Sequence, residues 1–135
     1  MSSDYKSCGL TVLRVVVGIV FLMHGGQKLF QLGLHGVAGF FQMIHIPVPQ
    51  VSSAVVTFVE FLGGAALVLG LLTRWAAILV ALDMAGAIYF VHGSKGFFLQ
   101  GGGYEFALTL LAANVALALA GPGSVALDNL VRRGK

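Results

Sequence analysis

The sequence predicts an all-α integral membrane protein, a four-helix bundle that crosses the bilayer up-down-up-down, with a short interfacial helix between the first two spans. Hydrophobic residues make up 58% of the 135 residues and charged residues only 10%, whereas soluble domains average about 25% charged residues. Four apolar stretches, at 10–30, 51–72, 75–92 and 104–120, approach the length that a helix rising about 1.5 Å per residue needs to cross a bilayer. We expect them to form one domain over residues 1–135.

The first stretch carries polar side chains that lipid does not tolerate. A charge near the bilayer centre costs about 2.5–3.5 kcal/mol, so these residues are expected to face a partner, a cavity or the membrane surface. On a helical wheel the first helix has one face that combines its charges with small residues: Arg14, Gly18, Phe21, Gly25 and Lys28. Residues 1–9 are predicted to be a polar tail, whose Cys8 has no second cysteine to pair with.

The connector over 31–50 is predicted to contain the interfacial helix. Val37, Phe40, Phe41 and Ile44 follow the i, i+3, i+4, i+7 spacing of an amphipathic helix on the membrane surface or at the mouth of the bundle. The prolines at 47 and 49 end it. His35 and His45 flank this helix, and solvated loop histidines are favoured over a metal site.

The second and third spans each hold one acidic residue near the middle, Glu60 and Asp83. A tight turn at 73–74 makes these two spans antiparallel neighbours. The predicted inner face of the second is Ser53, Thr57, Glu60, Gly64 and Leu67, and that of the third is Ala76, Val80, Asp83, Gly86, Ala87 and Phe90.

The fourth span follows the glycine-rich loop 93–103 and begins with Glu105, which suits a helix N-terminus through the helix dipole alone. Asn114 is expected on the opposite face, against a neighbouring subunit or a polar cavity. Gly121-Pro122-Gly123 ends the span before a short amphipathic tail.

The basic residues predict the orientation in the membrane. Lys6, Arg74, Arg132, Arg133 and Lys135 gather on one side, whereas the loops of the other side hold Lys95. Because cytoplasmic loops are enriched in Lys and Arg, both termini are predicted to be cytoplasmic. The net charge of +3 is too small for a nucleic-acid surface.

With both termini in the cytoplasm, the rise of about 1.5 Å per residue gives each side chain a depth in the membrane. The polar side chains in the middle and outer parts of the spans are expected to line one polar cavity that opens outward: His24, Lys28, Glu60, Asp83, His92 and Glu105. Arg14 lies deeper, where it snorkels to phosphates or reaches into the bundle. One interpretation makes the acidic residues structural partners of Lys28, His24 or Arg14. The other, which we favour, makes them a functional cavity, because apolar residues often pack as well as buried ion pairs do.

Several short motifs, in this order and spacing, resemble the DoxX family of small four-helix membrane proteins. They are HGGQKLF at 24–30 after Arg14, GFF at 39–41 with IPVP at 46–49, E-x-x-GG-x-x-L-x-x-GLLTR at 60–74, Met84-x-x-Ala87 with His92, GFF at 96–98, Gly103-Tyr104-Glu105, and GPG at 121–123 before Leu127-Asp128. The resemblance implies a bundle in the bacterial plasma membrane and a redox role, since relatives include a subunit of a thiosulfate:quinone oxidoreductase. The polar positions that match the family pattern are His24, Lys28, Glu60, His92 and Glu105, whereas Asp83 does not belong to it.

Two hypotheses for function follow. In the first, the protein is an oxidoreductase component that binds a quinone or similar small redox molecule in the cavity. Glu60 and His24 would handle protons there, and Lys28 would hold an oxygen. In the second, the protein is a non-catalytic partner or assembly factor for another protein complex. A transporter or channel would require an oligomer. The sequence has no haem-attachment motif, cysteine pair or nucleotide fingerprint.

Overall fold

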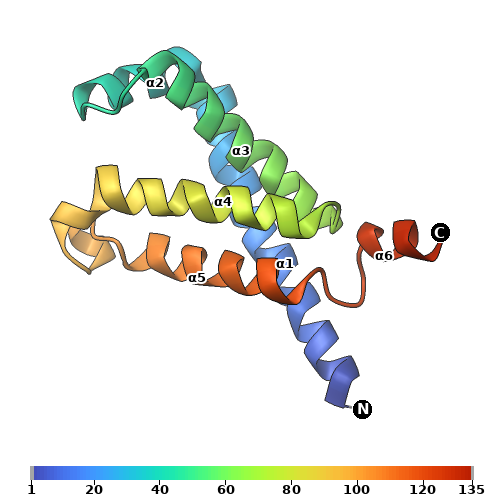
Figure 1. Cartoon of the computed structure of the whole chain (residues 1–135). Helices are drawn as coiled ribbons and strands as arrows, with labels where there is room; N and C mark the ends of the chain where they lie inside the picture. Colours follow the sequence, from blue (N-terminus) through green and yellow to red (C-terminus); the bar gives the residue numbers. More distant parts are fainter. Residues whose placement is uncertain (1, 135) are drawn as a thin grey trace.

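The computed structural model describes residues 2–134 and is helical, with no strand in that part of the chain (Figure 1). Lys135, one of the basic residues used to predict the orientation, lies outside the described residues. The α-helices are α1 (Ser2–Gly26), α2 (Gly33–Met43), α3 (Pro49–Leu69), α4 (Thr73–Ala87), α5 (Glu105–Ala120) and α6 (Leu127–Arg133). A π-helical turn, Gln27–Leu32, joins α1 to α2, and another, Ile88–His92, extends α4.

The first helix is longer than predicted. The expected polar tail is helical from Ser2 onwards, and Asp4 lies in its first turn, where a negative charge favours a helix N-terminus. At the other end the helical backbone continues through the π turn into α2, which is the predicted interfacial helix. Val37, Ala38 and Phe41 of α2 are buried.

Helices α1 and α3 form the most extensive contact in the molecule, and glycines bring them together. A Cβ atom added at Gly25 would collide with the backbone of Phe61, and one added at Gly64 would collide with the backbone of Leu22. Pairing of Gly25 with Phe61 and of Leu22 with Gly64 shows that the helices run antiparallel. The predicted inner face of α3 is confirmed, because its five residues are the buried ones.

Helix α4 packs mainly against α5, and the two run antiparallel, since the Arg74 guanidinium donates hydrogen bonds to the carbonyl oxygens of Ala118 and Leu119. The turn between α3 and α4 lies at 70–72 rather than at 73–74, because Gly70 and Leu72 adopt left-handed conformations that end one helix and begin the next. From this turn α3 and α4 diverge (Figure 1).

The prediction for Asn114 was wrong. Its side chain is fully buried, and its amide nitrogen donates a hydrogen bond to the carbonyl of Leu110, four residues earlier in α5. The buried residues of α5 recur at 107, 110, 114 and 117, so Asn114 lies on the interior face of the helix.

The C-terminal segment is held by a set of contacts that we name the C-terminal clasp: Arg14, Gly70, Pro122, Val125 and Asp128. The buried Arg14 guanidinium donates 2.7 Å hydrogen bonds to the carbonyls of Pro122 and Val125. The Asp128 carboxylate accepts from the backbone amides that begin α4, and its own amide donates to the Gly70 carbonyl. A further bond from the Ser124 amide to the Ser7 carbonyl places the two ends of the chain at the same end of the molecule.

In the part of the chain that the structure describes, three helical segments are long and apolar enough to cross a membrane: 3–43, 49–69 and 73–95. Helix α5 is apolar but shorter, with 16 residues, and at about 1.5 Å per residue it covers about 24 Å. The structure therefore supports at least three spans, and the predicted fourth is short for a hydrocarbon core of about 30 Å.

Candidate functional site

A cavity of about 850 Å³ lies where α3 and α4 diverge, with α1 and α2 completing its walls. Most of the side chains that line it are apolar, including Val37, Phe40 and Phe41 of α2 and Met84 of α4. Six polar side chains interrupt this lining: His24, Gln27, Lys28, Glu60, Asp83 and His92. A cavity of this size, apolar except for a few converging polar groups, has the character of a small-molecule site.

An ion pair between Lys28 and Glu60 forms the centre of the polar lining. The Lys28 ammonium donates to Glu60 Oε2 at 2.7 Å, and the Glu60 side chain is only 6% exposed. Lys28 stands on the π turn after α1, and Glu60 stands on the buried face of α3. The close α1–α3 packing at Gly25 and Gly64 therefore brings the pair together and withdraws the carboxylate from solvent.

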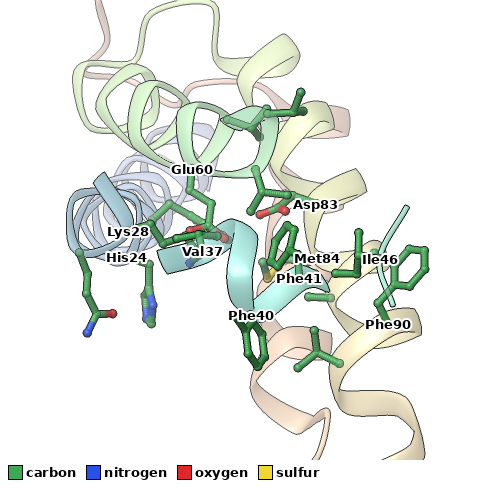
Figure 2. Close-up of a pocket in the computed structure, with 18 of the residues that line it drawn as sticks. His24, Lys28, Val37, Phe40, Phe41, Ile46, Glu60, Asp83, Met84 and Phe90 are labelled. Atoms are coloured by element: carbon green, nitrogen blue, oxygen red, sulfur yellow. Dashed lines mark hydrogen bonds and ion pairs between the residues drawn. The ribbon is translucent and has the colours of Figure 1, made fainter. Parts of the chain in front are cut away.

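Asp83 comes from α4 and faces the same ion pair. Glu60 and Lys28 are its electrostatic neighbours, and its carboxyl group points into the pocket (Figure 2). The Asp83 Oδ2 atom is buried and has no hydrogen-bond partner among the described residues. The divergence of α4 from α3 leaves space beside it, since a Cβ added at Gly86 would meet no atom within 4 Å.

The two predicted histidines line the same cavity in different ways. His24 is exposed and tilts against Phe106, with 6.3 Å between ring centroids. His92 Nδ1 lies 2.7 Å from the Gly102 carbonyl, and because a carbonyl only accepts, Nδ1 is the donor in this hydrogen bond. Within residues 2–134, no three His, Cys, Asp or Glu side chains are grouped to hold a metal ion.

Two of the predicted site residues lie outside the cavity. Arg14 belongs to the C-terminal clasp. Glu105 accepts a 2.8 Å hydrogen bond from the Leu99 amide and so holds the loop before α5. The structure thus brings together five of the seven candidates, His24, Lys28, Glu60, Asp83 and His92, and separates the other two.

Sequence reasoning missed the aromatic wall of the site. Phe40 and Phe41 were predicted as members of an amphipathic pattern and of a family motif but not as site residues, yet they line the pocket (Figure 2). The available signal was the spacing of the connector together with its position directly after Lys28, which allows α2 to fold back over α3. Gln27, a polar residue at the end of the first span, also lines the cavity.

Comparison with known proteins places this architecture in a family. The DoxX family model matches residues 9–93. A Bacillus subtilis protein named "Putative oxidoreductase CatD" is 39% identical over 127 residues, which cover 94% of this chain and 90% of that protein. An uncharacterized membrane protein of Mycobacterium tuberculosis is 34% identical to this chain, and the aligned residues cover 86% of this chain and 77% of that protein.

The inner membrane protein YqjF of Escherichia coli is 28% identical over 95% of both chains. No solved structure matches this chain. The helical membrane architecture and the match over 9–93 agree, and the chain belongs to the DoxX family.

Proposed function

We propose that the protein is a membrane oxidoreductase component that binds a quinone or a similar lipid-soluble redox carrier in the pocket between α3 and α4. The observation that carries this proposal is the junction of a large apolar cavity with a buried Lys28–Glu60 pair. A quinone has the matching shape, with two polar oxygens on one ring and a long apolar tail. The name of the Bacillus subtilis relative supports the redox class.

The walls of the pocket favour a ligand that arrives from the membrane. Val55 on α3 and Leu79 and Leu82 on α4 line the cavity, and these side chains are 56%, 51% and 65% exposed. In a bilayer such exposed apolar residues face acyl chains. We propose that the pocket opens sideways towards lipid, whereas the sequence predicted an outward opening. A volume of about 850 Å³ suits a ring and the first part of a tail.

The polar groups suggest how protons would move. Lys28 has three ammonium donors, of which Glu60 takes one, so another can hold a ring oxygen. Glu60 lies at hydrogen-bonding distance from the Lys28 ammonium group. Glu60 can therefore exchange a proton with the ring oxygen that Lys28 holds. His24, on the same wall and partly open, can pass the proton onward.

The test is to purify the protein in mild detergent and to identify bound small molecules by solvent extraction and mass analysis. We expect a quinone with the wild type and none with Glu60→Gln. Removing one partner of a buried pair is destabilising, whereas replacing both partners by apolar residues of similar volume is often neutral. The double variant Lys28→Met/Glu60→Met therefore separates binding from folding, because it should fold and bind nothing.

A quinone retained by the folded double variant would refute the proposed site. A wild-type protein that carries no small molecule would instead favour the role of a non-catalytic partner or assembly factor. Crosslinking in intact cells would then be the measurement that finds the partner.

A further inference from the structure

Helix α6 is amphipathic, and its polar side chains are bonded to the rest of the protein. The Asp128 carboxylate accepts hydrogen bonds from the amides of Leu72 and Thr73, where α4 begins. The Asn129 side chain donates to two carbonyl oxygens of the segment between α5 and α6. The polar face of α6 is therefore turned towards the bundle.

The face of α6 that points away from the protein is apolar. Leu127, Leu130 and Val131 fall within an arc of about 100° on the helix, and these side chains are 38%, 62% and 58% exposed. None of them lines the cavity between α3 and α4. An amphipathic helix of a soluble protein presents its polar face to the outside, so the reverse arrangement favours apolar surroundings for α6.

The level of α6 in the membrane follows from where it is attached. Its Asp128 amide donates to the carbonyl of Gly70, in the turn between the apolar helices α3 and α4. Helix α6 lies beyond the ends of α3, α4 and α5 (Figure 1), at the level where the spans leave the hydrocarbon core. Amphipathic helices at this level bury their apolar face about 5–10 Å into the boundary between headgroups and acyl chains.

Two arginines add a charge preference to this apolar face. Arg132 and Arg133 stand in the last turn of α6 and are exposed. The other two arginines of the chain, Arg14 and Arg74, donate to backbone carbonyls. A guanidinium group matches the paired oxygens of a phosphate, whereas two α6 helices packed face to face would bring four like charges together.

We propose that α6 is an interfacial anchor: its apolar face lies in the leaflet at this end of the spans, and Arg132 and Arg133 bind the headgroups of anionic phospholipids. In the predicted orientation this is the cytoplasmic leaflet. The inference concerns a surface outside the pocket and does not depend on the proposed function. Each basic residue beside an anionic membrane surface favours association by a factor of roughly five.

The first test locates α6 by spin labelling of the full chain in vesicles of equal parts phosphatidylglycerol and phosphatidylcholine. In a Cys8→Ser background, the label is attached to Leu130→Cys on the apolar face or to Gly134→Cys just beyond the helix. We expect the label at position 130 to collide mainly with oxygen, which dissolves in acyl chains. The label at position 134 should collide mainly with a water-soluble nickel chelate present on both sides.

Two results would overturn the anchor. A label at position 130 that collides mainly with the nickel chelate would place the apolar face in water, as expected for a surface that a partner protein covers. Dipolar broadening between labels at position 130, at low protein density in the vesicles, would show that a second copy of the chain covers it.

The second test measures the headgroup preference. The protein is extracted from the same vesicles in mild detergent, and the lipids that stay bound are counted by mass spectrometry. We expect the wild type to be enriched at least fivefold in phosphatidylglycerol, and Arg132→Gln/Arg133→Gln to lose most of this enrichment. Both side chains are exposed, so this variant should fold like the wild type.

Two control variants separate the charge of α6 from the charge of the whole protein. Arg132→Lys/Arg133→Lys keeps both charges and should keep most of the enrichment. Lys95→Gln removes an exposed charge at the opposite end of the span 73–95 and should bind lipid like the wild type. An unchanged enrichment in Arg132→Gln/Arg133→Gln, or an equal loss in Lys95→Gln, would refute the role of the two arginines.

Discussion

A substitution at Arg14 tests whether this charged residue stabilises the fold or contributes to the pocket. The guanidinium is 2% exposed and donates two 2.7 Å hydrogen bonds to carbonyls that follow α5. It does not line the pocket. Arg14→Met should therefore release the C-terminal clasp, and the pocket should keep its ligand.

The magnitude follows from the two lost bonds. A hydrogen bond made by a charged group contributes about 1.5–3 kcal/mol, and methionine keeps part of the apolar packing of the arginine stem. The released carbonyls of Pro122 and Val125 regain water. We therefore take the lower end, a loss of about 3 kcal/mol, which corresponds to roughly a hundredfold larger population of the opened segment.

Hydrogen exchange followed by mass spectrometry measures this opening. The reporter is the Asp128 amide, which donates to the Gly70 carbonyl at 2.8 Å and should exchange roughly a hundredfold faster in Arg14→Met. Arg14→Lys is the control. Its compact ammonium keeps the charge but loses the fork that serves two carbonyls, so its exchange should be intermediate.

Unchanged exchange at Asp128 in Arg14→Met would refute the clasp. Loss of the bound ligand by a variant that stays folded would also contradict the structural role, and it would return Arg14 to the binding site.

The remaining predictions concern the pocket, the orientation and the helix packing. Leu82→Trp should fill the opening of the pocket and abolish carrier retention with the unfolding temperature nearly unchanged, because the side chain is 65% exposed; retention in this variant would show that the carrier enters elsewhere. The single cysteine, Cys8, is exposed. If both termini are cytoplasmic, Cys8 should resist a membrane-impermeant maleimide in intact spheroplasts, whereas the cysteine of Cys8→Ser/Lys95→Cys should react. The reverse pattern would invert the predicted orientation. Gly25→Val should separate α1 from α3 and destabilise the protein by several kcal/mol, measured as loss of a monodisperse elution peak, whereas Gly39→Ala, with no atom within 4 Å of its new Cβ, should elute like the wild type.

The faces of individual helices were predictable because burial follows the helical period. The five residues assigned to the interior of the second span are the five buried residues of α3, and the small and charged stripe of the first span packs against them. The third span was predicted less well. Asp83, Gly86 and Phe90 line a cavity instead of packing against a helix. Periodicity identifies an inward side but says nothing of the distance to the next helix.

Apolar length and polar periodicity are properties of the chain alone, so the membrane class, the helical segments and the helix faces that carry Lys28 and Glu60 could be predicted from the residues. Tertiary structure decided which charges meet. The left-handed residues Gly70 and Leu72 set the divergence of α3 and α4, and that divergence opens the pocket and admits Asp83 beside Glu60. The position of a residue along a helix cannot distinguish a side chain that faces a cavity from one that forms hydrogen bonds with the backbone of a neighbouring loop. Contacts between residues far apart in the chain make that distinction, and they place Arg14 in the C-terminal clasp and Glu105 against the loop before α5.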